Sequence, residues 1–465
     1  MRGRASAFGI AISFALLLAP CGLASDAAAR IGADVIVTAA PVYVPLAELR
    51  GQERFPKGAQ LLLLHADHAE PLVPGFAASA DANVYFDGRL VLFAGKQLAS
   101  DPWQIWELKL KDRSVRKVVV TATDAERPLY LPAGRMVYAV RTTHGFRLDS
   151  TDDGHPLPYT PLNPTAGPGE LALSYTQANA FPADILKDGR VLFEAGFPLG
   201  SGTTPELYLV YADGSGVESY RCDHGQARWG GVQLSSGDVA FTHGVSLARF
   251  TSPLAHEERI AAPAAQYAGE IAETASGDWL LSTRASASGP YVLKLWKPGT
   301  AAMETVLAKN GESLVEPVLV AQRTTPKRHP SGLHPWDYAN LLALDARLSR
   351  DGALHGTPVA VRVETQDAAH HAVVMGTAPV EKDGSFFVQV PGDTPIRFAL
   401  LDAKGAVLRQ EHGWFWSRGG EQRICVGCHT GPERAADNRV PAVLLRTTTP
   451  ADMTHAAQRA LTGGR

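Results

Sequence analysis

The chain has 465 residues, of which 45% are hydrophobic and 20% are charged, as in a folded globular protein. Its formal net charge is −3, and it has no basic stretch of the kind that contacts phosphate backbones, so we expect no nucleic-acid partner. The length predicts two domains, or one large domain with an appendage, and the 44 glycines and 32 prolines predict many turns.

The first 24 residues have the order of a secretory signal peptide: two arginines, an apolar run from residue 5 to residue 18, and then small residues. Small residues at the −3 and −1 positions predict cleavage after Ala24. The alternative is a lipoprotein with its lipid anchor on Cys21, although Pro20 stands where a small residue is expected. Either form predicts export to the periplasm.

Residues 25–322 contain a repeated unit in which a turn that ends in glycine precedes a short apolar strand. The turn glycines, spaced 40 to 55 residues apart, are Gly88, Gly134, Gly189, Gly237 and Gly277. This period is typical of β-propeller blades, small sheets that bury their faces only by stacking around an axis. We predict an all-β protein with a propeller of six or seven blades, in which residues 25–75 and 305–325 supply the remaining strands and close the ring. The alternative, a β-sandwich, shows similar local strand spacing but not the longer period.

The repeat resembles that of TolB-type propellers over residues 76–300, where an Asp-Gly turn leads into an apolar strand. The resemblance implies a propeller fold. Four side chains are candidates for the propeller funnel, with ordinary loop residues as the alternative: His224, Arg228, Trp229 and His243. Cys222 has no cysteine partner left, and we expect a structural thiol there.

Two further segments precede the end of the chain. Residues 323–335 are basic, contain proline and have few apolar side chains, which predicts a linker. Residues 336–411 alternate short apolar strands with turns such as Asp383-Gly384, which predicts a small, β-sandwich-like module. Residues 412–465 remain as a separate segment.

This last segment contains Cys425-Val426-Gly427-Cys428-His429, a C-x-x-C-H motif that is the attachment sequence of c-type haem. The thiols of Cys425 and Cys428 add to the haem vinyl groups, and the imidazole of His429 becomes the axial iron ligand. A zinc site would need a second pair of ligands, and the chain has only 4 cysteines. A thioredoxin-like dithiol would need a βαβ context, which this region does not show. We therefore predict one covalent haem c, held by residues 412–465.

Several nearby side chains are candidates for holding the haem. Three aromatic residues are either a wall of the haem pocket or ordinary core residues: Trp414, Phe415 and Trp416. Three arginines are either partners of the haem propionates or surface residues: Arg418, Arg423 and Arg434. The sixth iron ligand decides between a closed electron carrier and an open, ligand-binding iron, and its candidates are His355, His370, His371, Met375, His412, Met453 and His455. His355, in a glycine-bounded turn before a strand, is slightly favoured as the distal ligand.

The strings at residues 379–386, 390–395 and 400–405, followed by Gly420-Glu421 and the C-x-x-C-H motif, resemble the family of the hydrazine synthase alpha subunit. Further matching strings lie upstream, at residues 316–318, 323–326 and 329–331. The resemblance implies that Cys425 and Cys428 bind haem and that His429 ligates the iron. In that family the reacting haem belongs to the middle domain and has its own motif. This chain has no second C-x-x-C-H, so we interpret its motif as that of the C-terminal, electron-relay haem, which argues against hydrazine chemistry.

Three functions follow as hypotheses. The first, which we predict, is an exported single-haem c-type cytochrome that transfers electrons to or from a redox partner protein or a small molecule. The second is a periplasmic oxidoreductase with chemistry in the propeller funnel or at an open haem face. The third is a binding propeller with a structural or sensing haem. The sequence contains no nucleophile elbow and no phosphate-binding loop that would indicate another enzyme class.

Overall fold

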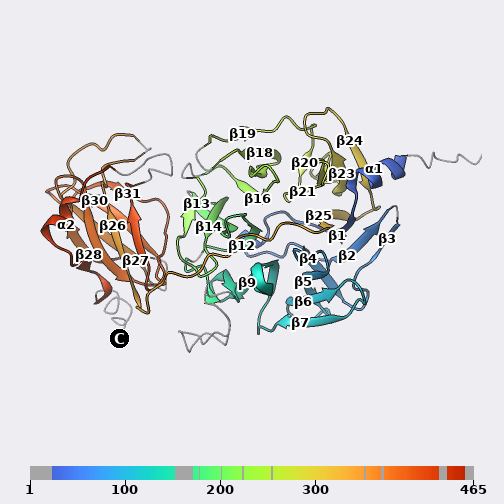
Figure 1. Ribbon diagram of the computed structural model, residues 1–465, viewed down its shortest axis with the longest axis horizontal. Helices are drawn as coiled ribbons and strands as arrows, with labels where there is room; N and C mark the ends of the chain where they lie inside the picture. Colours follow the sequence, from blue (N-terminus) through green and yellow to red (C-terminus); the bar gives the residue numbers. More distant parts are fainter. Residues whose placement is uncertain are drawn as a thin grey trace, which may run out of the picture.

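The computed structural model describes residues 23–66, 68–151, 171–176, 178–199, 202–221, 225–252, 255–349, 352–367, 371–428 and 437–455. Strands make up nearly all of the regular structure in these residues, which confirms the all-β prediction. Figure 1 shows two parts: a group of small sheets, coloured blue to yellow, and a two-sheet body, coloured orange to red.

The described residues between 34 and 320 form six antiparallel sheets. The first contains β1 (Asp34–Ala40), β2 (Gln60–His65), β3 (His68–Pro71) and β25 (Ser313–Val320). The second contains β4 (Ala78–Val84), β5 (Leu90–Lys96), β6 (Gln104–Lys109) and β7 (Val115–Val119). The third contains β8 (Ala125–Tyr130), β9 (Met136–Thr142), β10 (Gly145–Ser150) and β11 (Leu171–Ala172).

The other three sheets continue the same order along the chain. The fourth contains β12 (Ala180–Ile185), β13 (Val191–Leu199), β14 (Gly202–Val210) and β15 (Glu218–Ser219). The fifth contains β16 (Arg228–Gln233), β17 (Val239–His243), β18 (Ser246–Phe250) and β19 (Glu258–Arg259). The sixth contains β20 (Gln266–Tyr267), β21 (Ala272–Glu273), β22 (Trp279–Arg284), β23 (Val292–Trp296) and β24 (Met303–Leu307).

The six sheets are arranged in a cycle. Each sheet contacts the next one in sequence, and the sixth contacts the first through β22 and β25. The cycle is closed because β1 pairs with both β2 and β25, so that Val35 lies opposite Leu64 on one side and Leu319 on the other. This is the arrangement of a β-propeller-like fold, in which neighbouring sheets cover each other's apolar faces.

The predicted turn glycines lie where the repeat required them. They lie directly before β5, β9, β13, β17 and β22. Each of these is the second strand in its sheet, from the second sheet to the sixth. Gly189 is also a close contact point, because a Cβ atom there would clash with the carbonyl oxygen of Lys327. Its φ of +93° is another reason for glycine at this position.

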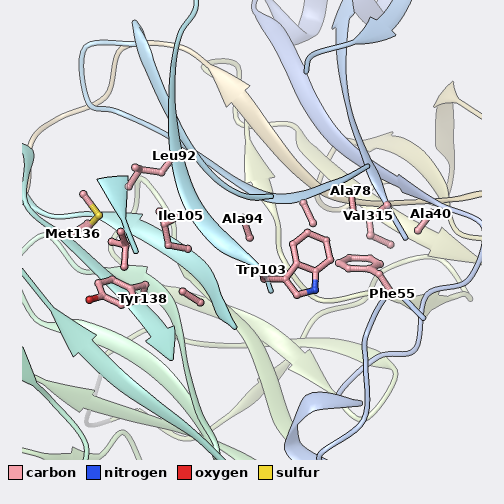
Figure 2. Packing of buried hydrophobic residues seen from close by; sticks show 14 of the residues in the cluster. Ala40, Phe55, Ala78, Leu92, Ala94, Trp103, Ile105, Met136, Tyr138 and Val315 are labelled. Carbon is pink, nitrogen blue, oxygen red and sulfur yellow. The ribbon is translucent and has the colours of Figure 1, made fainter. Parts of the chain in front are cut away.

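Side chains from neighbouring sheets pack together between them. Figure 2 shows one such cluster, in which residues of the first three sheets and of the loop before β2 meet. Leu92 and Ile105 of the second sheet and Tyr138 of the third are fully buried there. Val91 and Phe93, in the same strand as Leu92, pack in a second apolar cluster, so β5 is buried on both faces and its apolar run is continuous.

The segment predicted as a linker runs along the surface of the ring. The amide of Arg323 donates a hydrogen bond to Phe86 O in the second sheet, and the amide of Lys327 donates one to Lys187 O in the fourth. The ring of His329 stacks on Tyr211 with 4.1 Å between ring centroids. These contacts attach the segment to the propeller before the second body begins.

The second body is a pair of four-stranded sheets. One has the order β32 (Gln422–Cys425), β26 (Tyr338–Ala343), β29 (Phe386–Pro391), β33 (Ala451–Asp452). The other has the order β28 (Ala372–Pro379), β27 (Ala360–Gln366), β30 (Ile396–Leu401), β31 (Val407–Gln410). Side chains of both sheets form one buried apolar cluster between them. Because β32 and β33 come from residues 412–465, the predicted module and the predicted haem segment share a sheet.

Few helices are present in the described residues: α1 (Leu23–Ile31), the short 3-10 turns Glu48–Arg50 and Pro132–Gly134, and α2 (Ala442–Arg446). Arg30 in α1 pairs with Asp278 and Glu304 of the sixth sheet. The predicted cleavage site after Ala24 lies at the start of α1, and residues 1–22, with Cys21, lie outside the described residues. None of the helices in the described part is long and apolar enough to cross a membrane.

Candidate functional site

Strand β32 carries the first cysteine of the C-x-x-C-H motif. It pairs in parallel with β26, and Cys425 lies opposite Ala343. The amide of Leu344 donates a hydrogen bond of 2.9 Å to Cys425 O, which fixes the end of the strand. β32 is the edge strand of its sheet in the described part of the chain, so the motif begins at an uncovered border of the body.

Cys428, the second cysteine, lies against the apolar cluster of the two-sheet body. It lines a small pocket whose floor is made by Phe398 and Leu400 of β30. Arg409, Gln410 and Glu411 line the same pocket, but the surface that the pocket exposes is apolar. Both thiols are free and partly buried, so the motif presents two unpaired thiols beside an apolar surface.

Burial is the main influence on both thiols. It raises the pKa of Cys425, against a smaller opposing effect of Arg423. It also raises the pKa of Cys428 strongly, with Glu411 acting in the same direction. The thiols are therefore protonated at neutral pH, whereas the attacking thiol of a dithiol oxidoreductase has a lowered pKa.

Six of the residues to which the sequence analysis assigned roles lie outside the described residues, so these roles remain predictions: Cys21, Cys222, His224, His370, His429 and Arg434. The axial position of His429 is among them. Within the described ranges, no group of three or more His, Cys, Asp and Glu side chains is placed to hold a metal ion.

His355 is exposed, and its loop is attached to the strand beside Cys428. Arg409 Nη2 donates a hydrogen bond of 3.0 Å to Gly352 O, and Gly356 faces the side chain of Leu408. Because Arg409 also lines the pocket of Cys428, the structure brings the His355 loop and the motif to neighbouring parts of the body.

The other candidates for the sixth ligand are divided between surface and core. His412 is exposed, as are His371 and His455, whose rings lie 3.4 Å from Asp367 and Asp452. Met375 and Met453 are buried in the apolar cluster of the body, where both side chains contribute to packing.

The aromatic residues before the motif pack the two bodies together. Trp416 is 3% exposed and belongs to an apolar cluster of the propeller sheets. Phe415 contacts both that cluster and the cluster of the two-sheet body. Trp414 lies under the guanidinium group of Arg397, 4.5 Å from its ring centroid. Core packing is therefore the structural role of Trp416, and Phe415 lies between the two bodies.

Two of the predicted propionate partners are engaged at the same junction. Arg418 pairs with Asp393 at 2.6 Å and donates a hydrogen bond to the hydroxyl of Tyr175 in the propeller. Arg423 Nη2 donates a hydrogen bond of 2.7 Å to Val217 O, also in the propeller. Both guanidinium groups thus join the body that carries the motif to the propeller.

Three of the four residues predicted at the funnel are described, and they lie in the fifth sheet: Arg228, Trp229 and His243. Arg228 Nε and His243 Nδ1 both contact the carboxylate of Glu257, at 2.8 and 2.5 Å. Trp229 Nε1 donates a hydrogen bond of 3.0 Å to Gly244 O. These contacts stabilise the sheet locally.

A buried charged network at the centre of the ring was not predicted from the sequence. Arg54 contacts the carboxylates of Glu48, Asp81 and Glu316, and Arg127 contacts Glu48 and Glu194. Asp81, Arg127 and Glu316 have φ values of 59°, 49° and 59°, at irregular positions of β4, β8 and β25. These three strands contact each other in the order β25, β4, β8, so the irregular residues face a common centre. The local feature of the sequence that could have indicated this network is a charged residue within an apolar strand, such as Asp81 in β4.

Comparison with known proteins gives one family match and several structural matches. Residues 343–430 match the family model of the hydrazine synthase alpha subunit middle domain. Hydrazine synthase from Kuenenia stuttgartiensis superposes with a TM-score of 0.76 at 16% identity, over 89% of this chain and 71% of that chain. TolB from Acinetobacter baumannii gives a TM-score of 0.45 at 12% identity, over 64% and 68% of the two chains. No curated protein matches the chain.

The family match bears on one interpretation of the sequence. Residues 343–430 include the whole C-x-x-C-H motif, and the matching model is that of the middle domain. The comparison therefore does not support the interpretation of this motif as that of the C-terminal, electron-relay haem. In fold the chain is similar to hydrazine synthase over most of its length, and in sequence residues 343–430 are similar to the middle domain of its alpha subunit.

Proposed function

We propose that this protein is an exported redox protein with one covalent haem c, attached through Cys425 and Cys428 and ligated by His429. Its function in this proposal is electron transfer to a redox partner protein or a small molecule. The observation that carries the proposal is the position of the two thiols, which are unpaired and partly buried at the end of an edge strand, beside an apolar floor.

The chemistry of this donor set fits a thioether-linked haem. Burial raises the pKa of both thiols, so both are neutral. A dithiol that exchanges disulfides needs a thiolate, so neutral thiols agree better with cysteines that form thioether bonds to haem. Phe398 and Leu400 offer an apolar surface next to Cys428. A bound haem would supply one-electron chemistry at its iron, and the protein would hold it, orient it and limit its contact with water.

The body that carries the motif is firmly attached to the propeller. Arg418, Arg423 and Trp416 make the contacts described above. In the proposal, the propeller therefore serves as the docking platform for the partner, because it is fixed relative to the haem. The predicted signal peptide supports a periplasmic location, since covalent haem attachment takes place outside the cytoplasm; the lipid anchor on Cys21 remains the alternative.

Covalent attachment is tested first. The protein is produced in the periplasm with haem-attachment machinery, and haem is measured on a denaturing gel and as the pyridine haemochrome. We expect about one haem per chain in the wild type and in the Cys222→Ala control, and none in the Cys425→Ala/Cys428→Ala variant. Wild-type protein without covalent haem, or a double variant that keeps it, would contradict the proposal.

A second candidate function is an oxidoreductase with an open haem face. The specific observation in its favour is the match of residues 343–430, motif included, to the middle domain of a hydrazine synthase subunit. Carbon monoxide separates the two functions, because only an iron with an open or weakly held sixth position binds it. A low-spin spectrum that carbon monoxide does not change supports electron transfer, and a high-spin, carbon monoxide-binding spectrum supports the oxidoreductase.

A further inference from the structure

The guanidinium group of Arg409 has a hydrogen-bonding position that the protein does not use. Arg409 lies on β31, the edge strand of its sheet in the described part of the chain. Its Nη2 donates a hydrogen bond of 3.0 Å to Gly352 O, whereas its Nη1 is buried and has no hydrogen-bond partner. A buried cationic donor without an acceptor is unfavourable, so Nη1 indicates an acceptor that the chain alone does not supply.

Arg409 lies at the border of the body along which the C-x-x-C-H motif runs. Cys425 ends β32, the edge strand of one sheet, and Cys428 shares a small pocket with Arg409 of β31, the edge strand of the other. A haem attached to both cysteines therefore lies along this border. The pocket is apolar and encloses only about 10 Å³, so the acceptor of Nη1 lies outside it. Arg409 is partly exposed, so its guanidinium group can turn toward an acceptor at the border.

The carboxylate of Glu411, which lines the same pocket, is not this acceptor. Glu411 Oε2 accepts a hydrogen bond of 3.4 Å from the amide of Phe398. Among the described residues, no carboxylate forms an ion pair with Arg409. The positive charge beside Cys428 therefore lacks a counter-charge from the described part of the chain.

The proposed haem has a carboxylate to offer at this position. In a c-type haem, each pyrrole ring that carries a thioether bond is next to a pyrrole ring that carries a propionate. A guanidinium group beside Cys428 is thus close to the side of the haem from which one propionate extends. Arginine binds carboxylates through charge-assisted hydrogen bonds, which are shorter and stronger than those between neutral groups.

We infer that Arg409 binds a propionate of the covalent haem through Nη1. The inference rests on the proposed function, because it requires a haem on the motif. The arginines that the sequence indicated are less suitable: Arg418 and Arg423 join the body to the propeller, and Arg434 lies outside the described residues. Arg409 was missed because it lies 16 residues before the motif and in no recognisable pattern.

Arg409 then connects two parts of the site. Its Nη2 holds Gly352 O, at the start of the loop that carries His355, and its Nη1 holds the haem. The ion pair also balances the negative charge of the propionate. Without Arg409, this charge stabilises ferric iron over ferrous iron, so the midpoint potential of the haem becomes more negative.

Resonance Raman spectroscopy of the haem-loaded, full-length protein tests the inference, because the bending mode of a propionate responds to the hydrogen bonds of its carboxylate. In Arg409→Met we expect this band to move to lower frequency and the midpoint potential to become more negative. The matched control is Arg362→Met. Arg362 lies in the same sheet and also has a buried, unpartnered nitrogen, but it pairs with Glu364 and lies outside the pocket of Cys428. We expect its propionate band to match that of the wild type.

The pyridine haemochrome of each protein separates failure of this inference from failure of the proposed function. A wild type without covalent haem contradicts the proposed function, and the inference with it. Full haem attachment with the same propionate band in the wild type and Arg409→Met overturns the inference alone, as does an equal shift in Arg362→Met. A purely structural role through Gly352 changes the spin-state bands but not the propionate band. If Arg409→Met does not fold, Arg409→Gln replaces it with the same expectations.

Discussion

Arg127 Nη2 lies 2.8 Å from Glu48 Oε2, although the two residues are 79 positions apart in the chain. Glu48 belongs to the segment between the first two strands of the first sheet, and Arg127 belongs to the inner strand of the third. With Arg54 they connect charged side chains from several sheets at the centre of the ring. The network therefore adds ion pairs between sheets to the apolar contacts that the sheets already share.

Removal of Arg54 is expected to destabilise the protein strongly. Its side chain is 2% exposed and lies among three carboxylates, so Arg54→Met leaves buried negative charges without a partner. A loss of about 3–5 kcal/mol in the free energy of unfolding is expected from breaking such a pair. The control is Arg113→Met, which breaks a surface pair with Glu70 and should cost about 0–1 kcal/mol. Urea unfolding followed by tryptophan fluorescence measures both, and equal losses would contradict a structural role for the network.

Glu270 is expected to make stability depend on pH. Burial of its carboxyl group, followed by the charge of Glu316, raises its pKa to about 8, against the opposing effects of Arg127 and Arg54. The folded state thus keeps a proton that the unfolded state loses near pH 4.5, so Glu270 lowers stability progressively as the pH rises from about 4.5 to about 8. The variant Glu270→Gln should lose this component, so its stability should exceed that of the wild type most at pH 8 and above. Thermal unfolding of both proteins from pH 5 to 9 checks this, and parallel curves would show that Glu270 does not titrate in this range.

His355 is expected to be the sixth iron ligand of the proposed haem. Its loop is attached to β31, next to the pocket of Cys428, so His355→Ala should change the haem from low-spin to high-spin and allow carbon monoxide to bind. The control is His371→Ala, an exposed histidine on a different loop, which should leave the spectrum unchanged. A low-spin spectrum in His355→Ala would assign the ligand to another residue.

Gly189 is expected to be needed for docking of the linker onto the ring. Gly189→Ala combines a left-handed backbone with a clash against Lys327 O, whereas Gly237→Ala has a similar φ of +97° and open space around its Cβ position. Both variants should lose about 1 kcal/mol through backbone strain, and only Gly189→Ala should also release the linker. Trypsin cleavage after Arg323, Lys327 and Arg328 measures this release. Equal cleavage in the two variants would show that the contact with Lys327 has no structural role.

Local patterns were sufficient to predict the strands of the ring. Turn glycines such as Gly88 and Gly277 and the apolar residues after them depend only on neighbours in sequence, so their spacing indicated the repeated sheets. The pairing of β1 with β25 confirmed the expectation that the two ends of the repeat meet. The boundary between the two-sheet body and the haem segment could not be placed in this way, because the parallel pairing of β32 with β26 joins residues about 80 positions apart.

The sequence by itself determined the all-β fold class and the type of cofactor motif, because both depend on the order and spacing of neighbouring residues. Only the tertiary structure decided that Trp416, Arg418 and Arg423 join the two bodies, and that Glu48, Arg54 and Arg127 meet at the centre of the ring. The physical reason is that an ion pair or a buried contact is defined by distance in space. Residues that meet only when the ring closes have no regular spacing along the chain, so a sequence pattern does not predict their contacts.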